Sequence, residues 1–176
     1  MKEISYFLMK IQYRIRGRDK EVASNYFRKM GMKIGKGCNI CDNITTNEPY
    51  LIEIGDNVTT SAGVTFVTHD NSVSKVIPNC TDIFGKIVIG NNCFLGSGCM
   101  ILYGVTIPNN VIVAAGSVVT KSIDQENVIV AGNPAKVIST WDSFSQKMLP
   151  YVWNLDLTSR EVLIESARTE ERLIRR

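Results

Sequence analysis

A period of six residues runs through the middle of the chain. From Ile89 to Val119, every sixth residue is aliphatic. An α-helix repeats every 3.6 residues, and a hairpin protein does not hold a six-residue register, so neither explains the pattern. Each unit is better explained as one short strand plus one corner, with the aliphatic residue pointing into a core. These inward residues are Ile89, Leu95, Ile101, Ile107, Val113 and Val119.

Turn-forming residues follow most of these positions, as in Gly90-Asn91-Asn92 and Pro108-Asn109-Asn110. Three units make a triangular coil of about 18 residues, and coils stack at the strand spacing of about 4.8 Å. An upstream set continues the frame, with a slip of two at the insertion Thr46–Pro49; it comprises Ile34, Ile40, Ile54, Thr60 and Phe66. We therefore expect an all-β, left-handed parallel β-helix of about five coils over residues 34–138, with parallel sheets on three faces.

The frame breaks at residues 67–86, which we expect to form a loop. A long loop that leaves a rigid solenoid is a common place for function. We expect residues 1–33 to form an N-terminal helical segment, divided into two helices at Gly17. Residues 139–176 should form a C-terminal extension that ends in a helix over 158–176. An aromatic stretch in this extension is expected to pack on the last coil or on a neighbouring subunit.

Charge and composition exclude some classes of protein. The formal net charge of +3 gives no support for nucleic-acid binding. Residues 1–36 hold ten Lys and Arg against three acidic residues. This excess is typical of a solvated helix face, or of weak attraction to an anionic membrane surface or substrate. No apolar run approaches the ~20 residues of a membrane span, and no signal peptide is evident, so we expect a cytoplasmic protein.

The five cysteines do not indicate a disulfide framework, because their number is odd and the cytosol keeps thiols reduced. Cys38 and Cys41 form a C-x-x-C pair inside the repeat, where small residues are needed for packing. We interpret them as packing residues, because a lone pair without a second pair or a nearby His is a weak metal signal.

His69 is the single histidine, and it stands where the chain leaves the coil. A three-histidine metal site therefore cannot be built from one chain, and no nucleophile-elbow motif supports a Ser-His-Asp hydrolase. An imidazole that titrates near neutral pH is suited to accept a proton from a hydroxyl. The alternative is a structural histidine whose hydrogen bonds are satisfied.

The repeat run, the histidine at the loop entry and the closing segment Val130–Ile138 together resemble the hexapeptide-repeat acetyltransferases. The galactoside, maltose and xenobiotic acetyltransferases and the sugar O-acetyltransferases of polysaccharide synthesis are the most similar groups. The resemblance covers about residues 34–140. It implies a homotrimer with active sites between subunits, acetyl-CoA as co-substrate in a groove along the coils, and no metal. It also implies that His69 is the general base for direct attack of an acceptor hydroxyl on the thioester.

The same resemblance assigns the residues that bind the co-substrate. The motif around Ser97 lies near the thioester oxygen in the family, and a developing oxyanion there needs a donor. The backbone at Ala115 is assigned to the pantetheine arm. Thr120 and Lys121 are placed near the nucleotide, and Lys136 of the closing motif is assigned to the CoA phosphates.

Some acceptor-site assignments stay open. Phe94 stands where many relatives have Trp, so the wall of the thioester site can differ here. A second histidine common in serine acetyltransferases is absent, which argues against serine as acceptor. Family members often place a carboxylate in the acceptor site, and the sequence does not rank the candidates Glu48, Asp70 and Asp82.

A sugar hydroxyl is the acceptor favoured by family analogy alone. An N-acetyltransferase of an amino-sugar or a xenobiotic is a second reading. A non-catalytic scaffold or binding β-helix is a third, although a scaffold has no need of His69 together with Lys121 and Lys136.

Overall fold

The computed structural model describes residues 2–17, 19–41, 43–154, 160–169 and 174 of the chain. The chain divides into two compact units, Met1–Ile138 and Ser139–Arg176. The first unit carries almost all of the strands and every candidate site residue, and is described first.

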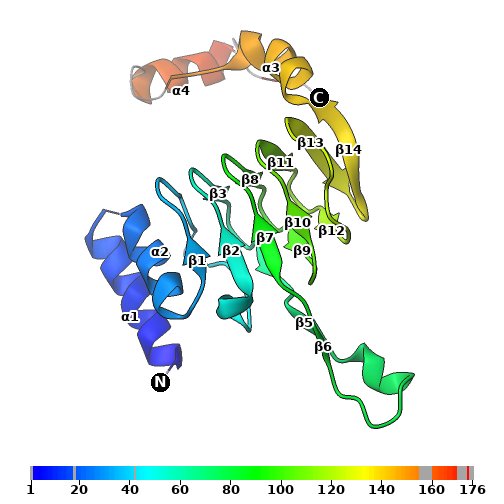
Figure 1. Cartoon of the computed structure of the whole chain (residues 1–176). Helices are drawn as coiled ribbons and strands as arrows, with labels where there is room; N and C mark the ends of the chain where they lie inside the picture. The colour runs from blue at the N-terminus through cyan, green and yellow to red at the C-terminus, as the bar shows by residue number, and fades with distance from the viewer. Residues whose placement is uncertain (1, 18, 42, 155–159, 170–173, 175–176) are drawn as a thin grey trace. The chain divides into compact units, whose positions relative to one another are not determined.

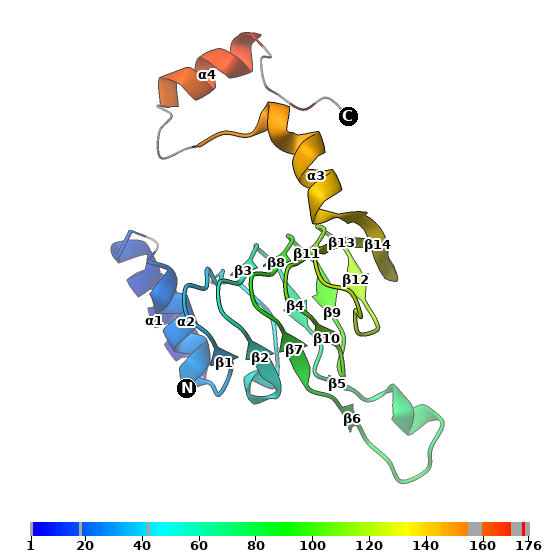
Figure 2. The ribbon, with the colours of Figure 1, turned by 45° about the horizontal axis from the view of Figure 1, so that its top comes forward.

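Three sheets of very short strands form the centre of the first unit (Figures 1 and 2). The first sheet has the order β1 (Lys33–Ile34), β2 (Ile52–Ile54), β7 (Ile87–Ile89), β10 (Thr106–Ile107). The second has the order β3 (Thr59–Thr60), β8 (Phe94–Leu95), β11 (Val111–Val113), β13 (Val128–Gly132), β14 (Ala135–Thr140). The third has the order β4 (Thr65–Phe66), β9 (Met100–Ile101), β12 (Val118–Val119). The chain visits the three sheets in turn, as the six-residue repeat predicts.

From β1 to β13, neighbouring strands within each of the three sheets are parallel, and their pairing gives the length of each coil. Met100 pairs with Val118, a step of 18 residues, as expected for three six-residue units. Thr65 pairs with Met100, a step of 35, because the loop over 67–86 lies between them. Thr45 pairs with Thr65, a step of 20, which confirms the slip of two residues at the Thr46–Pro49 insertion.

The inward positions predicted from the repeat form the core. All six aliphatic residues from Ile89 to Val119 are buried, and so are Ile40, Ile54 and Phe66 of the upstream set. Cys38, Cys93 and Cys99 fill small inward positions, and burial raises the pKa of each thiol, that of Cys99 to about 12. A thiol that stays protonated is a packing group rather than a nucleophile, as expected for Cys38.

A ladder of asparagines stabilises the corner between the first and second sheets. Asn57, Asn92 and Asn110 occupy successive coils, each with φ between 55° and 57°. Asparagine tolerates this left-handed conformation better than most residues. The amide of Asn57 donates to Asn92 at 2.7 Å, and that of Asn92 donates to Asn110 at 2.9 Å. The turn residues therefore also connect one coil to the next.

The segment over 67–86 leaves the third sheet through a short antiparallel neck. In this neck β5 (His69–Asp70) pairs with β6 (Ile83–Phe84), and His69 lies opposite Phe84. A 3-10 turn, η2 (Ser72–Lys75), lies farther out. Figure 1 shows this arm projecting from the stacked coils.

Two helices, α1 (Lys2–Ile15) and α2 (Lys20–Lys29), precede the first coil, with Gly17 between them in a left-handed conformation. This confirms the predicted division at Gly17. Arg28 fixes α2 to the coil, because its guanidinium donates to the carbonyls of Ile34 and Gly35 at 3.0 and 2.7 Å. Phe27 closes the end of the core. A 3-10 turn, η1 (Pro49–Leu51), precedes β2.

The second unit contains α3 (Trp141–Met148), η3 (Leu149–Tyr151) and α4 (Arg160–Thr169). The helix predicted over 158–176 is observed as α4, and the remainder of that range, apart from Ile174, lies outside the described residues. Across the part of the chain that the structure describes, no helix combines the length and the apolar character that crossing a bilayer requires.

Candidate active site

His69 and Glu48 form a hydrogen-bonded pair at the loop neck. The Nδ1 atom of His69 lies 2.9 Å from Oε2 of Glu48. The buried hydroxyl of Thr68 donates to the same carboxylate oxygen. The Glu48 side chain is 15% exposed and that of His69 is 30% exposed, so the imidazole is reachable while its partner is largely covered. The structure therefore separates Glu48 from the other two carboxylates that the sequence left unranked.

Register explains why Glu48 reaches this position. The step from the first coil to the second is 20 residues, and Glu48 precedes Thr68 by 20. Glu48 therefore lies one coil away from Thr68 on the same edge, beside the next residue, His69. The slip of two residues in the repeat already implies this 20-residue step from coil to coil. The sequence analysis did not use the step to rank the three carboxylates.

The contact between Glu48 and His69 bears on the tautomer and the pKa of the imidazole. An ionised carboxylate can only accept a hydrogen bond, so in the neutral imidazole this contact favours the tautomer with the hydrogen on Nδ1 and the lone pair on Nε2. The hydrogen bond that His69 donates to Glu48 raises the pKa of His69 above its ordinary value; burial opposes this, and the charges of Glu48, Asp82 and Asp70 add smaller increases. The ring of Phe84 lies 5.6 Å from the imidazole, tilted by 41°. The result is an oriented base of raised basicity.

Asp70 is mainly a loop-forming residue. It accepts from the amide of Ser72 at 2.8 Å and from the hydroxyl of Tyr103 at 3.2 Å. The Ser72 contacts and the Tyr103 hydroxyl lower the pKa of the Asp70 carboxyl. Asp82 is exposed and acts on His69 only through its charge. Neither makes a contact with His69 like that of Glu48.

A small cavity of about 150 Å³ lies beside the imidazole. It is lined by Thr45, Thr46, Asn47, Thr65, Phe66, Val67, Thr68 and His69. A second cavity, of about 340 Å³, shares Thr45, Thr46 and Asn47 with it and extends to Tyr6, Tyr26 and Phe27. His69 therefore lines a small space with hydroxyl and amide groups, and the more aromatic cavity adjoins it through the three shared residues.

Ser97 and Ala115 lie together at the corner where the chain passes from the second sheet to the third. The amide of Gly116 donates to the carbonyl of Ser97 at 2.9 Å, so the two turns stack on adjacent coils. Both residues are exposed. Phe94, 41% exposed on β8, precedes the same corner. These three predicted residues are thus brought together.

Thr120 and Lys121 follow β12, at the opposite end of the third sheet. His69 follows β4 at that same end, with the coil of Tyr103 between them. Lys136 lies on β14 of the second sheet and is exposed. The predicted convergence of Lys121 and Lys136 on phosphate therefore stays a prediction.

The predicted site falls into two groups within one chain. Ser97 and Ala115 precede the strands of the third sheet, and His69 follows one of them. Leu102 lies beside Val67, two residues before His69, at the far end of the third sheet. At about 3.3 Å per residue, the five steps from Ser97 to Leu102 span at most about 16 Å. His69 is thus not beside the Ser97 corner of its own chain.

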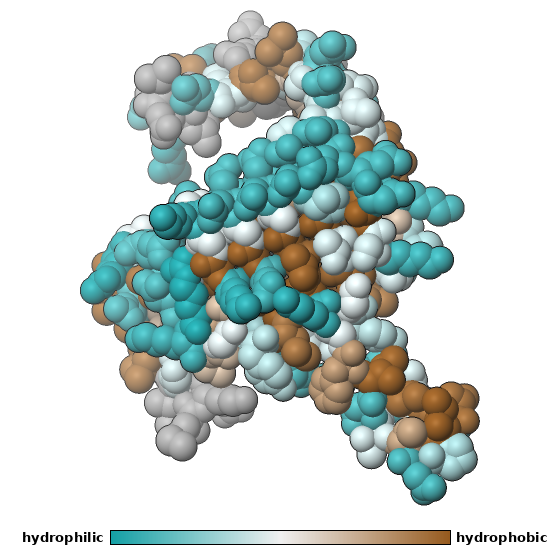
Figure 3. All heavy atoms as spheres, in the orientation of Figure 1, coloured by the Kyte–Doolittle hydropathy of each residue, from teal (hydrophilic) through white to brown (hydrophobic). Residues whose placement is uncertain are grey.

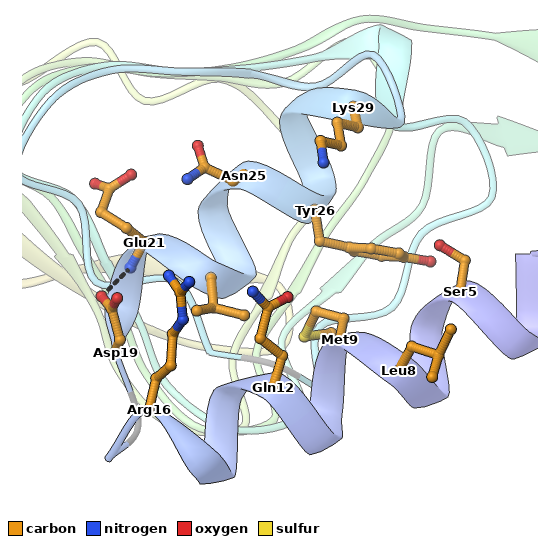
Figure 4. A pocket seen from close by; sticks show the side chains of 11 residues that line it. Ser5, Leu8, Met9, Gln12, Arg16, Asp19, Glu21, Asn25, Tyr26 and Lys29 are labelled. Atoms are coloured by element: carbon orange, nitrogen blue, oxygen red, sulfur yellow. Dashed lines mark hydrogen bonds between the residues drawn. The ribbon is translucent and has the colours of Figure 1, made fainter.

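A further cavity, of about 610 Å³, lies between α1 and α2 (Figure 4). Its lining includes Gln12 of α1, Arg16 just after α1, and Asn25 and Lys29 of α2. None of its lining residues is a predicted site residue. Although it is the roomier space, the chemistry described above lies elsewhere, at the loop neck.

Comparison with known proteins agrees with the repeat and with the fold. Residues 86–121 match the family described as the hexapeptide repeat of succinyl-transferase. The chain is 39% identical over 147 residues to protein CapG of Staphylococcus aureus, covering 80% of this chain and 83% of CapG. It is 38% identical over 106 residues to the galactoside O-acetyltransferase of Escherichia coli strain K12, covering 60% of this chain and 52% of that protein. The chain thus spans about half the length of that second relative.

Among solved structures, the maltose O-acetyltransferase of Clostridium difficile 630 has a TM-score of 0.60 and 27% identity, covering 78% of this chain and 84% of that chain. The sheets, the repeat and these relatives agree on one architecture, a hexapeptide-repeat β-helix with helices at the termini. The chain belongs to the hexapeptide-repeat acetyltransferase family.

Proposed function

We propose that this acetyltransferase transfers an acetyl group from acetyl-CoA to a hydroxyl of a sugar or saccharide, with His69 as the general base. The observation that carries the proposal is the Glu48–His69 pair at 2.9 Å beside the small cavity at the loop neck. Relatives whose names state O-acetylation of galactoside or maltose support a sugar acceptor. A role in polysaccharide synthesis, which the family resemblance implies, is part of this proposal. The five free cysteines suit the reducing cytosol.

The reaction is a direct transfer. The Nε2 lone pair of His69 accepts the proton of the acceptor hydroxyl as its oxygen attacks the thioester carbonyl carbon. A tetrahedral intermediate forms with negative charge on oxygen, which Ser97 is suited to stabilise as a hydrogen-bond donor. The C–S bond then breaks, and the departing thiolate recovers the proton from the imidazolium. Glu48 holds the tautomer and stabilises the transient positive charge on the ring.

The separation of His69 from Ser97 and Ala115 supports a shared active site. We propose that the donor groove of one copy faces the His69 of the next in a homotrimer of closed, left-handed β-helices of about five coils. In such a ring each copy contributes one half of two different sites. Lys121 and Lys136 then serve the CoA phosphates, and an isolated subunit is inactive.

The test of the base is His69→Ala, assayed by release of the CoA thiol across a panel of sugars and nucleotide sugars. A positioned base contributes about 10²–10⁴ to the rate, so turnover should fall at least ~100-fold while calorimetry shows acetyl-CoA affinity largely retained. Asn71→Ala, in the same loop and exposed, is the matched control and should keep its rate. A near-normal rate for His69→Ala would end the general-base proposal. Absence of thiol release from the unaltered protein on every acceptor would favour the scaffold reading.

The test of the shared site is complementation. His69→Ala and Ala115→Trp are each inactivating, and they are unfolded together and refolded as a mixture. If one site draws on two copies, random mixing restores about a quarter of the sites. If each site lies within one chain, no activity returns. Light scattering on the unaltered protein measures the number of subunits independently.

A further inference from the structure

One face of α1 is apolar and uncovered. Phe7 is 63% exposed, Leu8 58%, Ile11 40% and Ile15 79%. At 100° per residue these four side chains fall within about a 100° sector of the helix. We call them the α1 stripe; Leu8, at its edge, also lines the cavity between α1 and α2. Monomeric soluble proteins seldom gather large apolar side chains on one exposed strip without a use for it.

The opposite face of α1 already has its packing partner. Met9 is buried against Val22 and Ala23 of α2, with Tyr6 and Tyr13 packed around them. Figure 4 shows Met9 directed between the two helices. The helix is therefore apolar on two faces, and only one of them is needed to attach it to the molecule.

Positive charge borders the α1 stripe. Lys10 and Arg14 each follow a stripe residue by three positions and so lie on its flank. The Nζ atom of Lys10 lies 4.7 Å from the centre of the Tyr6 ring, which places the ammonium between the α1 stripe and the face of α1 that packs on α2. Residues 1–36 carry ten Lys and Arg against three acidic residues, and Figure 3 shows hydrophilic and hydrophobic side chains side by side at this end of the first unit.

We propose that α1 docks this enzyme onto an anionic lipid membrane, with the α1 stripe in the headgroup region and Lys10 and Arg14 on the lipid phosphates. An amphipathic helix with basic flanks binds in the plane of such a surface. Self-association through the same stripe would bring the cations of two copies together, whereas an anionic surface neutralises them. The helix lies on the bilayer, in keeping with the lack of a spanning helix among the described residues. An acceptor attached to the membrane would then be delivered to an enzyme held beside it.

The experiment is flotation of the full-length protein with lipid vesicles, and it needs no turnover. Neutral phosphatidylcholine vesicles are compared with vesicles containing about one third phosphatidylglycerol, at 0.1 and 0.5 M salt. Binding should appear with the anionic vesicles and weaken at high salt, because the screening length falls to a few Å. Phe7→Ser/Ile11→Ser should lower the partition coefficient at least about tenfold. Lys10→Gln/Arg14→Gln should lower it by about fivefold per charge.

Val76→Ser/Ile77→Ser is the matched control, because it removes two exposed apolar side chains from the arm over 67–86. It should float like the unaltered protein. Circular dichroism and turnover on a soluble acceptor should be unchanged in the α1 variants. Equal binding to neutral and anionic vesicles, or an equal loss in the control, would overturn the proposal. So would smaller assemblies of the Phe7→Ser/Ile11→Ser variant in light scattering, which would identify the stripe as a contact between copies.

Discussion

Gly96 lies where two coils approach most closely beside the predicted thioester site. A Cβ atom at this position would lie 2.5 Å from the backbone nitrogen of Ala115 and 2.8 Å from the carbonyl oxygen of Val113. These are backbone atoms, so the coils themselves must separate by about 1 Å to restore ordinary contact. The separation stretches two coil-to-coil hydrogen bonds, Gly96 to Val113 at 2.8 Å and Gly116 to Ser97 at 2.9 Å.

Gly96→Ala should therefore be strongly destabilising. Overpacking costs about 1–3 kcal/mol, and weakening two hydrogen bonds adds about 1 kcal/mol each, for a total of about 3–5 kcal/mol. Gly98→Ala is the matched control in the same turn. Its added Cβ meets open space, and only the left-handed backbone, φ +66°, costs about 1–2 kcal/mol.

Urea unfolding at one fixed protein concentration measures both variants, since assembly makes stability depend on concentration. Calorimetry with acetyl-CoA should show a greater loss of affinity for Gly96→Ala, because the Ser97 and Ala115 turns shift with the coil. If Gly96→Ala lost no more stability than Gly98→Ala, the close approach of the coils would be refuted as a constraint on this position.

Three further predictions concern charge at the site. Glu48→Gln removes the main cause of the raised pKa of His69. The acid limb of the kcat/KM profile should therefore move to lower pH, because an imidazole of lower pKa stays neutral down to a lower pH. A move to higher pH would contradict the pairing of Glu48 with His69. Asp70→Asn should leave the turnover within about threefold and the limb almost unmoved, since the charge of the half-buried Asp70 carboxylate is the smallest contribution to the raised pKa of His69. A loss as large as that of Glu48→Gln would reverse the ranking of the carboxylates. Lys121→Ala and Lys136→Ala should each weaken acetyl-CoA binding about three- to tenfold by calorimetry, as expected for a phosphate contact in a solvated groove, and unchanged affinity would remove that lysine from the donor site.

The solenoid could be predicted from sequence because each coil contacts mainly its neighbours. A six-residue period translates directly into burial, so Ile89, Leu95 and Val113 are inward as expected. The slip at Thr46–Pro49 was likewise visible as a break in frame, and the strand pairing confirms it.

The partner of His69 required the register as well as the repeat. Glu48, Asp70 and Asp82 are equivalent as residue types, and only the 20-residue step brings one of them to Nδ1. The neck of the loop was not predicted at all. Pairing of His69 with Phe84 depends on contacts across the loop, and two-residue strands leave no periodic signal in the sequence.

Because the neck of the arm over 67–86 is closed by strand pairing, the position of His69 does not depend on the length of the arm beyond it. Both ends of the arm are paired at His69–Phe84 and Asp70–Ile83, and the coils on either side resume a common register. Residues 71–82 can therefore be lengthened, shortened or replaced with little effect on the stack, since doubling a loop costs only about 0.6 kcal/mol. In the mechanism proposed above, exchange of the outer part of this arm would change the surface offered to the acceptor while His69, the proposed base, stays in place.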